Sequence, residues 1–256
     1  MKANFHTHTY RCNHATGDVR DYVEAAVQAG FDMLGMSDHT PWPNVVGVGM
    51  SVDQLPGYVA TIHSLREEYA GRIVLKTGLE CEYYRENTAW LRDTIAEAPL
   101  DYIILGNHFV EENGERLYFG GVTDKDGINR YLKRTIEGME TGLYAYLAHP
   151  ELYLRAYPQW DAAAKDVARE LARACKALNV PVEYNLEGVR ANRRGNHTGV
   201  GYPSRYFWEI AAEEGCTAII GYDAHAPEAL LDDSDFQAAR RLIEDELGMK
   251  RIDSIF

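Results

Sequence analysis

The chain alternates, about seven times from end to end, between segments with helical apolar spacing and short apolar runs. The first cycle runs from a helix start at Asp18, closed by Gly30, to the apolar run at 33–36. Helical spacing predicts a helix that buries one face, and a short apolar run between turn residues predicts a buried strand. Buried strands separated by helices form a parallel sheet. About seven such units in 256 residues favour a closed barrel over an open sheet.

The remaining expected elements follow the same alternation. Further helices are predicted over residues 51–69, 88–96, 126–138, 160–178, 203–214 and 235–247. Further strands are predicted over residues 73–80, 102–105, 143–147, 180–185 and 217–220. The longest insertions, near 41–50, 109–123 and 186–202, follow strand ends and should overhang the active face. No linker rich in Pro, Gly or Ser divides the chain, so residues 1–256 are expected to form a single domain.

Polar residues follow the predicted strands at the point where each strand ends. They are His6 and His8, His39, Glu80, His108, His149, Glu183 with Asn185, and Asp223 with His225. In a parallel barrel these strand ends face one rim, which is where the active sites of such folds lie. Seven of the nine histidines lie on this rim or beside it once His14 is counted, and the other two are His63 and His197.

These rim residues together favour a metal centre. His6 and His8 point the same way, because side chains alternate along an extended segment. A single histidine after a strand is commonly structural, but here six strand ends each deliver a histidine or a carboxylate to one rim. Seven histidines with Glu80 and Asp223 exceed one site and fit two or three ions that share a bridging carboxylate. Imidazole-rich sites suit zinc, iron, manganese or nickel.

The composition of the chain limits the kinds of molecule that it is expected to bind. The formal net charge of −13 argues against a surface that grips long nucleic acid, which needs clustered Lys and Arg. It permits a small anionic substrate, because bound cations make a site locally positive. The N-terminus has no apolar signal segment, and no stretch reaches the ~20 apolar residues of a membrane span. With four cysteines and no CxxC spacing, a cytoplasmic protein is expected, with its oligomeric state left open.

The strand-end motifs resemble those of the polymerase-and-histidinol-phosphatase (PHP) superfamily. They are His6-x-His8 with His14, Ser37-Asp38-His39, Gly78-Leu79-Glu80, Gly106-Asn107-His108, Ala148-His149-Pro150 and Asp223-Ala224-His225, in the family's order. The resemblance implies a distorted (β/α)7 TIM-like barrel with three divalent transition-metal ions, which would be zinc, iron or manganese. It implies one ion at His6, His8, Glu80 and Asp223, a second at Glu80, His108 and His149, and a third at His14, His39 and His225.

Within this superfamily the chain is most similar to the histidinol-phosphate phosphatases. The similarity rests on Cys12-Asn13-His14-Ala15, Ser37-Asp38-His39-Thr40-Pro41, Glu183-Tyr184-Asn185 with Gly188-Val189-Arg190, and Tyr202-Pro203-Ser204. It implies a metal-dependent phosphomonoesterase that hydrolyses L-histidinol phosphate in histidine biosynthesis. The nucleophile would be a metal-bridging hydroxide held by Glu80, Asp223, His6, His8, His108 and His149. Arg155 and Arg190 resemble the family's phosphate-binding arginines, and Glu183 and Asn185 are expected to brace the site.

Three alternatives stay open. A PHP-type phosphoesterase could act on another small phosphorylated metabolite or on a nucleotide, and the acidic balance does not decide between these substrates. An amide-hydrolysing barrel shares the HxH opening but commonly uses a carbamylated strand lysine as its bridge. Here Glu80 ends the strand and Lys76 lies nearer the strand start. A non-catalytic metal-binding module would lack some ligands, whereas all nine expected positions carry one.

Overall fold

A computed structural model describes residues 1–43, 49–112 and 115–256. Its first sheet is parallel and has the order β1-β2-β3-β4, with bounds Ala3–Asn4, Met33–Met36, Val74–Cys81 and Tyr102–Leu105. A second parallel sheet has the order β7-β8-β9, with bounds Val182–Asn185, Thr217–Gly221 and Lys250–Arg251. Strands β2, β3, β4, β7 and β8 overlap expected strand ranges, whereas β1 and β9 have two residues each, too few for a sequence pattern to define.

The two sheets join into one curled wall. Leu147 forms parallel bridges to Leu105 of β4 and to Val182 of β7. Thr7, just beyond β1, bridges in parallel to Ala224, just beyond β8. The order of strands therefore runs from β1 through β4, the segment at 147, β7 and β8, and returns to β1. The expected α/β fold with a curled parallel sheet is confirmed.

The prediction of a strand over residues 143–147 is wrong. Only Leu147 is bridged, although the Ala145 N–H also donates to the Ile103 carbonyl at 2.8 Å. Gly142, with φ +68°, and His149, with φ 27°, turn the chain on either side. The chain also bends at residues 145–146 and 148–149, so no continuous extended run is left to form a ladder.

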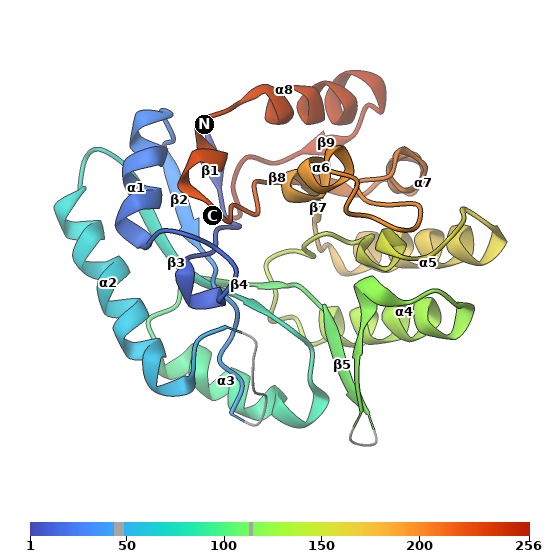
Figure 1. The fold of residues 1–256 in the computed structure, drawn as a ribbon, viewed down its shortest axis with the longest axis horizontal. Coiled ribbons are helices and arrows are strands. Elements are labelled where there is room, and N and C mark those ends of the chain that lie inside the picture. The colour runs from blue at the N-terminus through green and yellow to red at the C-terminus, as the bar shows by residue number, and fades with distance from the viewer. Residues whose placement is uncertain (44–48, 113–114) are drawn as a thin grey trace.

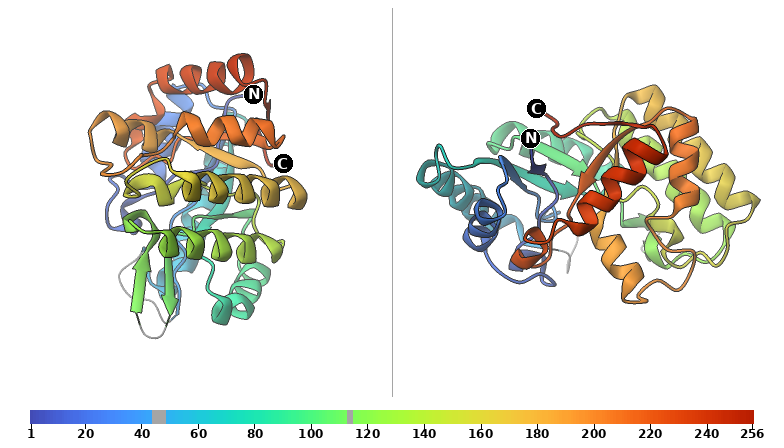
Figure 2. Two further views of the ribbon diagram at one scale, coloured as in Figure 1. Left: turned by 90° about the vertical axis from the view of Figure 1, so that its right-hand side faces the viewer. Right: turned by 90° about the horizontal axis from the view of Figure 1, so that it is seen from above.

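Helices cover the outside of the curled sheet (Figures 1 and 2). They are α1 Val19–Gln28, α2 Leu55–Glu68, α3 Thr88–Glu97, α4 Lys125–Glu140, α5 Ala162–Leu178, α6 Leu186–Arg193, α7 Arg205–Glu213 and α8 Ser234–Arg240. Asp18 and Asp21 form a capping box at the start of α1, which fixes where that helix begins. The helix expected over 235–247 is α-helical only as far as Arg240 and continues as a π-helix over Arg241–Glu246. Within the described ranges, no helix is long and apolar enough to cross a membrane.

Two of the expected insertions contain regular structure. Residues 109–123 include an antiparallel hairpin of β5 Phe109–Glu112 and β6 Glu115–Tyr118. Residues 186–202 begin with α6, which is capped by the Asn185 side chain where it accepts the Gly188 N–H at 2.8 Å. Both insertions contribute side chains to the cavity described below. Of the third insertion, 41–50, residues 44–48 lie outside the described part of the chain.

Alternate residues of the strands face two different cores, as the two-residue period of a strand requires. Those that face the helices join the main core, for example Leu34 and Met36 of β2. Those that face the inside of the curl form a smaller cluster: Ala3, Phe5, Tyr102, Ile104, Tyr146, Ala148 and Ile219. Gly35 and Gly78 leave space for the Tyr102 ring, because a Cβ on them would lie 2.3 and 2.4 Å from its atoms. Apolar side chains thus fill the interior below the rim, and polar ones are left at the rim.

Candidate metal centre

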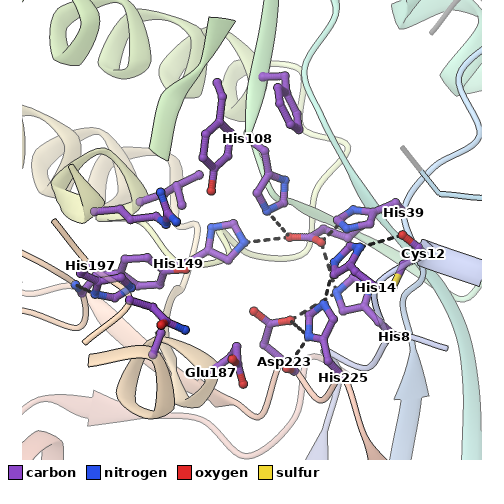
Figure 3. A pocket seen from close by; sticks show the side chains of 18 of the residues that line it. His8, Cys12, His14, His39, His108, His149, Glu187, His197, Asp223 and His225 are labelled. Carbon is purple, nitrogen blue, oxygen red and sulfur yellow. Dashed lines mark hydrogen bonds and ion pairs between the residues drawn. The ribbon is translucent and has the colours of Figure 1, made fainter. Parts of the chain in front are cut away.

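The polar residues of the strand ends meet in one cavity of about 540 Å³ (Figure 3). Its lining includes eight of the nine expected metal ligands: His8, His14, His39, Glu80, His108, His149, Asp223 and His225. The ninth, His6, is fully buried and places its Nε2 atom 3.1 Å from the Nε2 atom of His8. Residues from six strand ends, more than 200 positions apart in the chain, are therefore brought together.

Glu80 lies at the centre of an inner cluster, which we define as His6, His8, Glu80, His108, His149 and Asp223. The Oε1 atom of Glu80 is 2.9 Å from His149 Nε2 and 3.4 Å from His6 Nε2. Its Oε2 atom is 3.3 Å from His8 Nε2 and 3.2 Å from His39 Nδ1. A carboxylate with both oxygens among imidazoles is arranged as a bridging ligand between cations.

Carboxylates fix the tautomers of two inner histidines. Glu183 Oε1 lies 2.8 Å from His6 Nδ1, and Glu82 Oε1 lies 2.8 Å from His108 Nδ1. An ionised carboxylate only accepts hydrogen bonds, so in each neutral ring Nδ1 carries the hydrogen and Nε2 carries the lone pair. Such pairs orient histidines that bind a metal through the other nitrogen.

The outer pair, His14 and His225, is arranged in the same way but with neutral partners. The Cys12 carbonyl lies 2.7 Å from His14 Nδ1, and the Asp223 carbonyl lies 3.0 Å from His225 Nδ1. The two Nε2 atoms face each other at 3.0 Å. Burial, and after it the charge on His8, lower the pKa of His14. Burial outweighs the opposing charge of Asp223 and lowers the pKa of His225 to about 4, so neither ring favours an extra proton at neutral pH. Two facing lone pairs repel, and a cation between them removes the repulsion.

Several polar atoms of the site are buried without a hydrogen-bond partner. They are His8 Nδ1, Glu80 Oε2, His149 Nδ1 and Asp223 Oδ1. A buried, unpartnered carboxylate oxygen costs several kcal/mol unless a cation lies beside it. These atoms therefore fit a metal site.

Charge at the base of the cavity is dominated by carboxylates. Burial disfavours the charged form of His8 and His108, but neighbouring carboxylates outweigh it and raise both pKa values to about 9. Burial also opposes charge on Glu80 and Asp223, yet the surrounding histidines hold the pKa of each carboxyl well below its usual range. The site thus strongly favours ionised carboxylates and draws positive charge toward them, in the form of protons or of metal ions.

Backbone strain accumulates at the same place. Asn107, His149 and Asp223 have φ values of 45°, 27° and 45°, a left-handed conformation that costs a non-glycine residue about 1–3 kcal/mol. Hydrogen bonds hold two of these turns: the His149 N–H donates to Glu183 Oε2 at 3.0 Å, and Asn185 Nδ2 donates to Asp223 Oδ2 at 3.0 Å. Glu183 and Asn185 brace the site in this way, and the turns aim the side chains of His149 and Asp223 into the cavity (Figure 3).

The residues fall into close groups that differ in part from the expected ion assignments. Potential ligand atoms come within 4.8 Å of one another in four sets: His6 with His8 and Glu80, His6 with His149 and Asp223, His39 with Glu80 and His108, and His8 with Cys12 and His225. His39 therefore also contacts the inner cluster, with its Nδ1 atom 3.2 Å from Glu80 Oε2. Its ring lies 5.6 Å from that of His14, so it stands between the inner cluster and the outer pair. The division of the nine residues among ions stays a prediction.

The two expected phosphate-binding arginines differ in placement. Arg155 lines the cavity and donates to the Gly120 carbonyl at 3.3 Å. Arg190 is not part of the lining. Its Nε donates to Glu187 at 2.8 Å and its Nη2 donates to the Tyr222 carbonyl at 2.6 Å, which directs it at the backbone behind Asp223. Direct phosphate binding by Arg190 therefore stays a prediction. The contacts of Arg190 with Glu187 and with the Tyr222 carbonyl favour a role in positioning Asp223.

Sequence reasoning overlooked several cavity residues. Arg194 and His197 line the cavity, as Arg155 does, and neither was among the expected site residues. Glu82 was not singled out, although it lies two positions after Glu80 and therefore points to the same side of the strand. The lysine required by the amide-hydrolase alternative is absent from the cavity lining, because Lys76 Nζ lies 3.8 Å from Asp101 and over the Phe256 ring.

A family model described as "PHP domain" matches residues 4–187, which is more than two thirds of the sequence. The chain belongs to the PHP domain family. A Deinococcus radiodurans protein named "Probable histidinol-phosphatase" is 29% identical to this PHP protein over 234 residues, covering 87% of this chain and 85% of the relative. The histidinol-phosphatase of Bacillus subtilis is 30% identical over 128 residues, which is 46% of this chain and 47% of the relative.

The fold of this PHP protein is also that of a solved structure. A histidinol phosphate phosphatase from Lactococcus lactis, complexed with zinc, L-histidinol and phosphate, superposes with a TM-score of 0.76. The superposition covers 98% of this chain and 95% of the other, at 21% sequence identity. The resemblance in the strand-end motifs and the expected fold are thus both confirmed.

Proposed function

We propose that this chain is a metal-dependent phosphomonoesterase that hydrolyses L-histidinol phosphate to L-histidinol and phosphate in histidine biosynthesis. Membership of the PHP family and the names of the two relatives support the activity. The Lactococcus protein of the same fold, solved with zinc, L-histidinol and phosphate, supports the substrate. We also propose that residues 1–256 act as a single catalytic domain, since one hydrophobic core extends from Val19 to Met249.

One observation on this chain carries the proposal. The Nε2 atoms of His14 and His225 face each other at 3.0 Å, and those of His6 and His8 at 3.1 Å. For His14 and His225, a backbone carbonyl at Nδ1 directs the lone pair of Nε2 toward the facing ring. Divalent cations between such nitrogens make the arrangement favourable, and an enzyme without metals has no use for it.

The nine ligands suit three divalent ions. We assign one to His6, His8, Glu80 and Asp223, a second to Glu80, His108 and His149, and a third to His14, His39 and His225. Zinc, iron and manganese all accept such imidazole and carboxylate donors. When bound, such ions polarise a phosphoryl oxygen and lower the pKa of a water molecule, so that a nucleophile is present at neutral pH.

The chain's own residues bind and orient the substrate. Arg155 has a planar, permanently charged guanidinium that can donate two parallel hydrogen bonds to a phosphate. Arg190 positions Asp223 through the Tyr222 carbonyl. Phe109 and Tyr118, from the β5–β6 hairpin, line the cavity and limit the access of water to the reacting phosphate.

The assignment of the substrate can be tested by comparing kcat/KM values for several phosphomonoesters. L-histidinol phosphate is assayed against sugar phosphates and mononucleotides, and a Glu80→Gln variant controls for contaminating phosphatases. We expect L-histidinol phosphate to be preferred by at least about tenfold, which corresponds to about 1.4 kcal/mol of transition-state discrimination. Equal or better turnover of another phosphomonoester, abolished in the variant, would assign the site to a different small phosphorylated metabolite or nucleotide.

A further inference from the structure

We propose that the hydroxyl group of Tyr118 donates a proton to the ester oxygen of the substrate as the bond between phosphorus and that oxygen breaks. The inference rests on the proposed function, because it concerns the same reaction in the same cavity. Hydrolysis of a phosphate ester of a primary alcohol releases an alkoxide, which is strongly basic. Such a group leaves much faster when a positioned side chain protonates it.

The β5–β6 hairpin fixes Tyr118 at the edge of the metal centre. Tyr118 pairs with Phe109, the residue that directly follows the expected ligand His108. The next residue, Phe119, donates its N–H to the His108 carbonyl at 2.8 Å. The half-buried side chain of Tyr118 lines the cavity. Backbone pairing therefore ties the position of Tyr118 to the turn that carries His108.

Contacts with Arg155 place the Tyr118 hydroxyl beside the expected phosphate site. The central carbon of the Arg155 guanidinium lies 5.7 Å from the centroid of the Tyr118 ring. Arg155 also donates to the Gly120 carbonyl at 3.3 Å, and a Cβ on Gly120 would lie 2.5 Å from the Tyr118 Oη atom. The hydroxyl and the guanidinium therefore both lie against Gly120. A phosphate bound by Arg155 would lie next to this hydroxyl.

Tyr118 also comes from the side of the cavity that suits the leaving group. In an in-line displacement, the attacking and leaving oxygens lie on opposite sides of phosphorus. Glu80 and Asp223 are buried at the ends of β3 and β8, and the nucleophile is expected there. Tyr118 belongs to an insertion beyond the strand ends. Its hydroxyl therefore faces the other side of a bound phosphate, where the ester oxygen lies.

Other proton-bearing side chains of the described cavity lining fit this role less well. Arg155 and Arg194 keep their protons, because a guanidinium is not deprotonated in proteins. Burial, together with the charges of these two arginines, lowers the pKa of His197 to about 4, so its ring carries no extra proton at neutral pH. Cys12 lies close to expected metal ligands. Tyr202 stacks on the His197 ring at 4.8 Å and is the remaining rival.

Tyr118 is in the required form at neutral pH. A phenol has an ordinary pKa of about 10, and burial raises the pKa of Tyr118 further despite the nearby charge of Arg155. In the proposed step, the attacking oxygen bonds to phosphorus, and the bond between phosphorus and the ester oxygen breaks. The electron pair stays on the ester oxygen, which takes the proton of Tyr118. The tyrosinate then regains a proton from water, so the net reaction consumes one water molecule and transfers no electrons.

The dependence of the rate on the leaving group tests the proposal. L-histidinol phosphate releases a basic alkoxide, whereas p-nitrophenyl phosphate releases a phenolate that is stable without a proton. Because general-acid catalysis typically contributes about 10²- to 10⁴-fold, we expect Tyr118→Phe to lower the single-turnover rate for L-histidinol phosphate at least about 100-fold. The rate for p-nitrophenyl phosphate should fall less than about threefold, since this ester does not need the acid. Losses by the same factor for the two esters, including no loss with either, overturn the proposal.

Two other tyrosines provide controls. Tyr202→Phe removes the other tyrosine hydroxyl of the described lining and should change the rates for the two esters by the same factor. A selective loss in Tyr202→Phe instead of Tyr118→Phe would assign the acid to Tyr202 and overturn the proposal. Tyr206 is 54% exposed on α7, so Tyr206→Phe should leave both rates unchanged. Tyr118→Phe should bind as many Zn²⁺ ions per chain as the wild type, which separates its effect from damage to the metal centre.

A series of substituted phenyl phosphates gives a second measurement that includes the wild-type chain. Rates for the wild type should depend weakly on the basicity of the leaving phenolate, and those for Tyr118→Phe should depend on it steeply. A steep dependence in the wild type contradicts the proposal. If the wild type prefers another alkyl phosphate to L-histidinol phosphate, the comparison with p-nitrophenyl phosphate is made with that ester. A wrong substrate assignment and a wrong role for Tyr118 are therefore detected separately.

Discussion

Glu82 offers a sharp test of how the metal centre is held. Its carboxylate is 4% exposed, and it accepts hydrogen bonds from His108 Nδ1 at 2.8 Å and from the Phe109 N–H at 3.0 Å. Glu82→Gln preserves the size of the side chain but replaces one acceptor oxygen with an NH₂ group. Either the His108 Nδ1–H or the Phe109 N–H then faces this NH₂ group and loses its acceptor. Loss of such a partner behind a metal-binding histidine typically weakens metal affinity 10- to 100-fold. That range corresponds to about 1.4–2.8 kcal/mol.

The affinity can be measured by competition for Zn²⁺ with a chromophoric chelator at fixed pH. We expect the ion bound through His108 to be held 10- to 100-fold more weakly in Glu82→Gln, with an unchanged circular dichroism spectrum. Glu68→Gln is the matched control, because it also removes a paired carboxylate, one that bonds Arg20 at 2.6 Å on the exposed face of α2. Wild-type zinc affinity in a natively folded Glu82→Gln protein would refute the role given to Glu82.

Three further predictions concern the same region. His14→Ala should remove one metal ion per chain and leave the inner cluster loaded; counting metals by mass spectrometry would contradict this if the inner ions were lost as well. Gly221→Ala should cost about 1–3 kcal/mol in urea denaturation, because its Cβ would lie 1.8 Å from Glu183 Oε1, whereas Gly57→Ala, with nothing within 4 Å, should not destabilise. Burial raises the pKa of Glu151 from 4.5 to about 8, so the folded chain holds a proton that the unfolded chain releases. Stability should therefore fall by up to about 1.4 kcal/mol per pH unit between those values, and Glu151→Gln should flatten that slope; parallel profiles for the two proteins would disprove it.

The parts of the site that were predictable follow from the geometry of parallel sheets. His39, Glu80, His108, His149 and Asp223 each follow a buried apolar strand, and such strands place their ends at one rim. The sequence pattern therefore identifies which residues meet. It does not determine their pairwise distances, which depend on strain and packing at each turn. For this reason the pattern does not predict that His39, expected beside His14 and His225, also contacts Glu80.

The features that were missed had weaker or longer-range signals. The β5–β6 hairpin was treated as an insertion, although an Asn-Gly pair at 113–114, between short segments with apolar side chains, is a strong hairpin signal. Helix α6 contains Gly188, which disfavours a helix, and there a Cβ would lie 2.7 Å from the Tyr202 carbonyl. The contact of Arg190 with the Tyr222 carbonyl joins residues 32 positions apart. Local patterns do not report contacts of that range.

The central claim is that metal ions held by this chain hydrolyse L-histidinol phosphate. It is tested most directly by measuring phosphate release from that substrate with protein stripped by a chelator, and again after Zn²⁺ or Mn²⁺ is added back in steps. We predict no turnover by the stripped chain, and recovery that rises with the number of ions bound and levels off when the site is full. Hydrolysis at the full rate by the stripped chain, or none by the fully loaded one, would contradict the account.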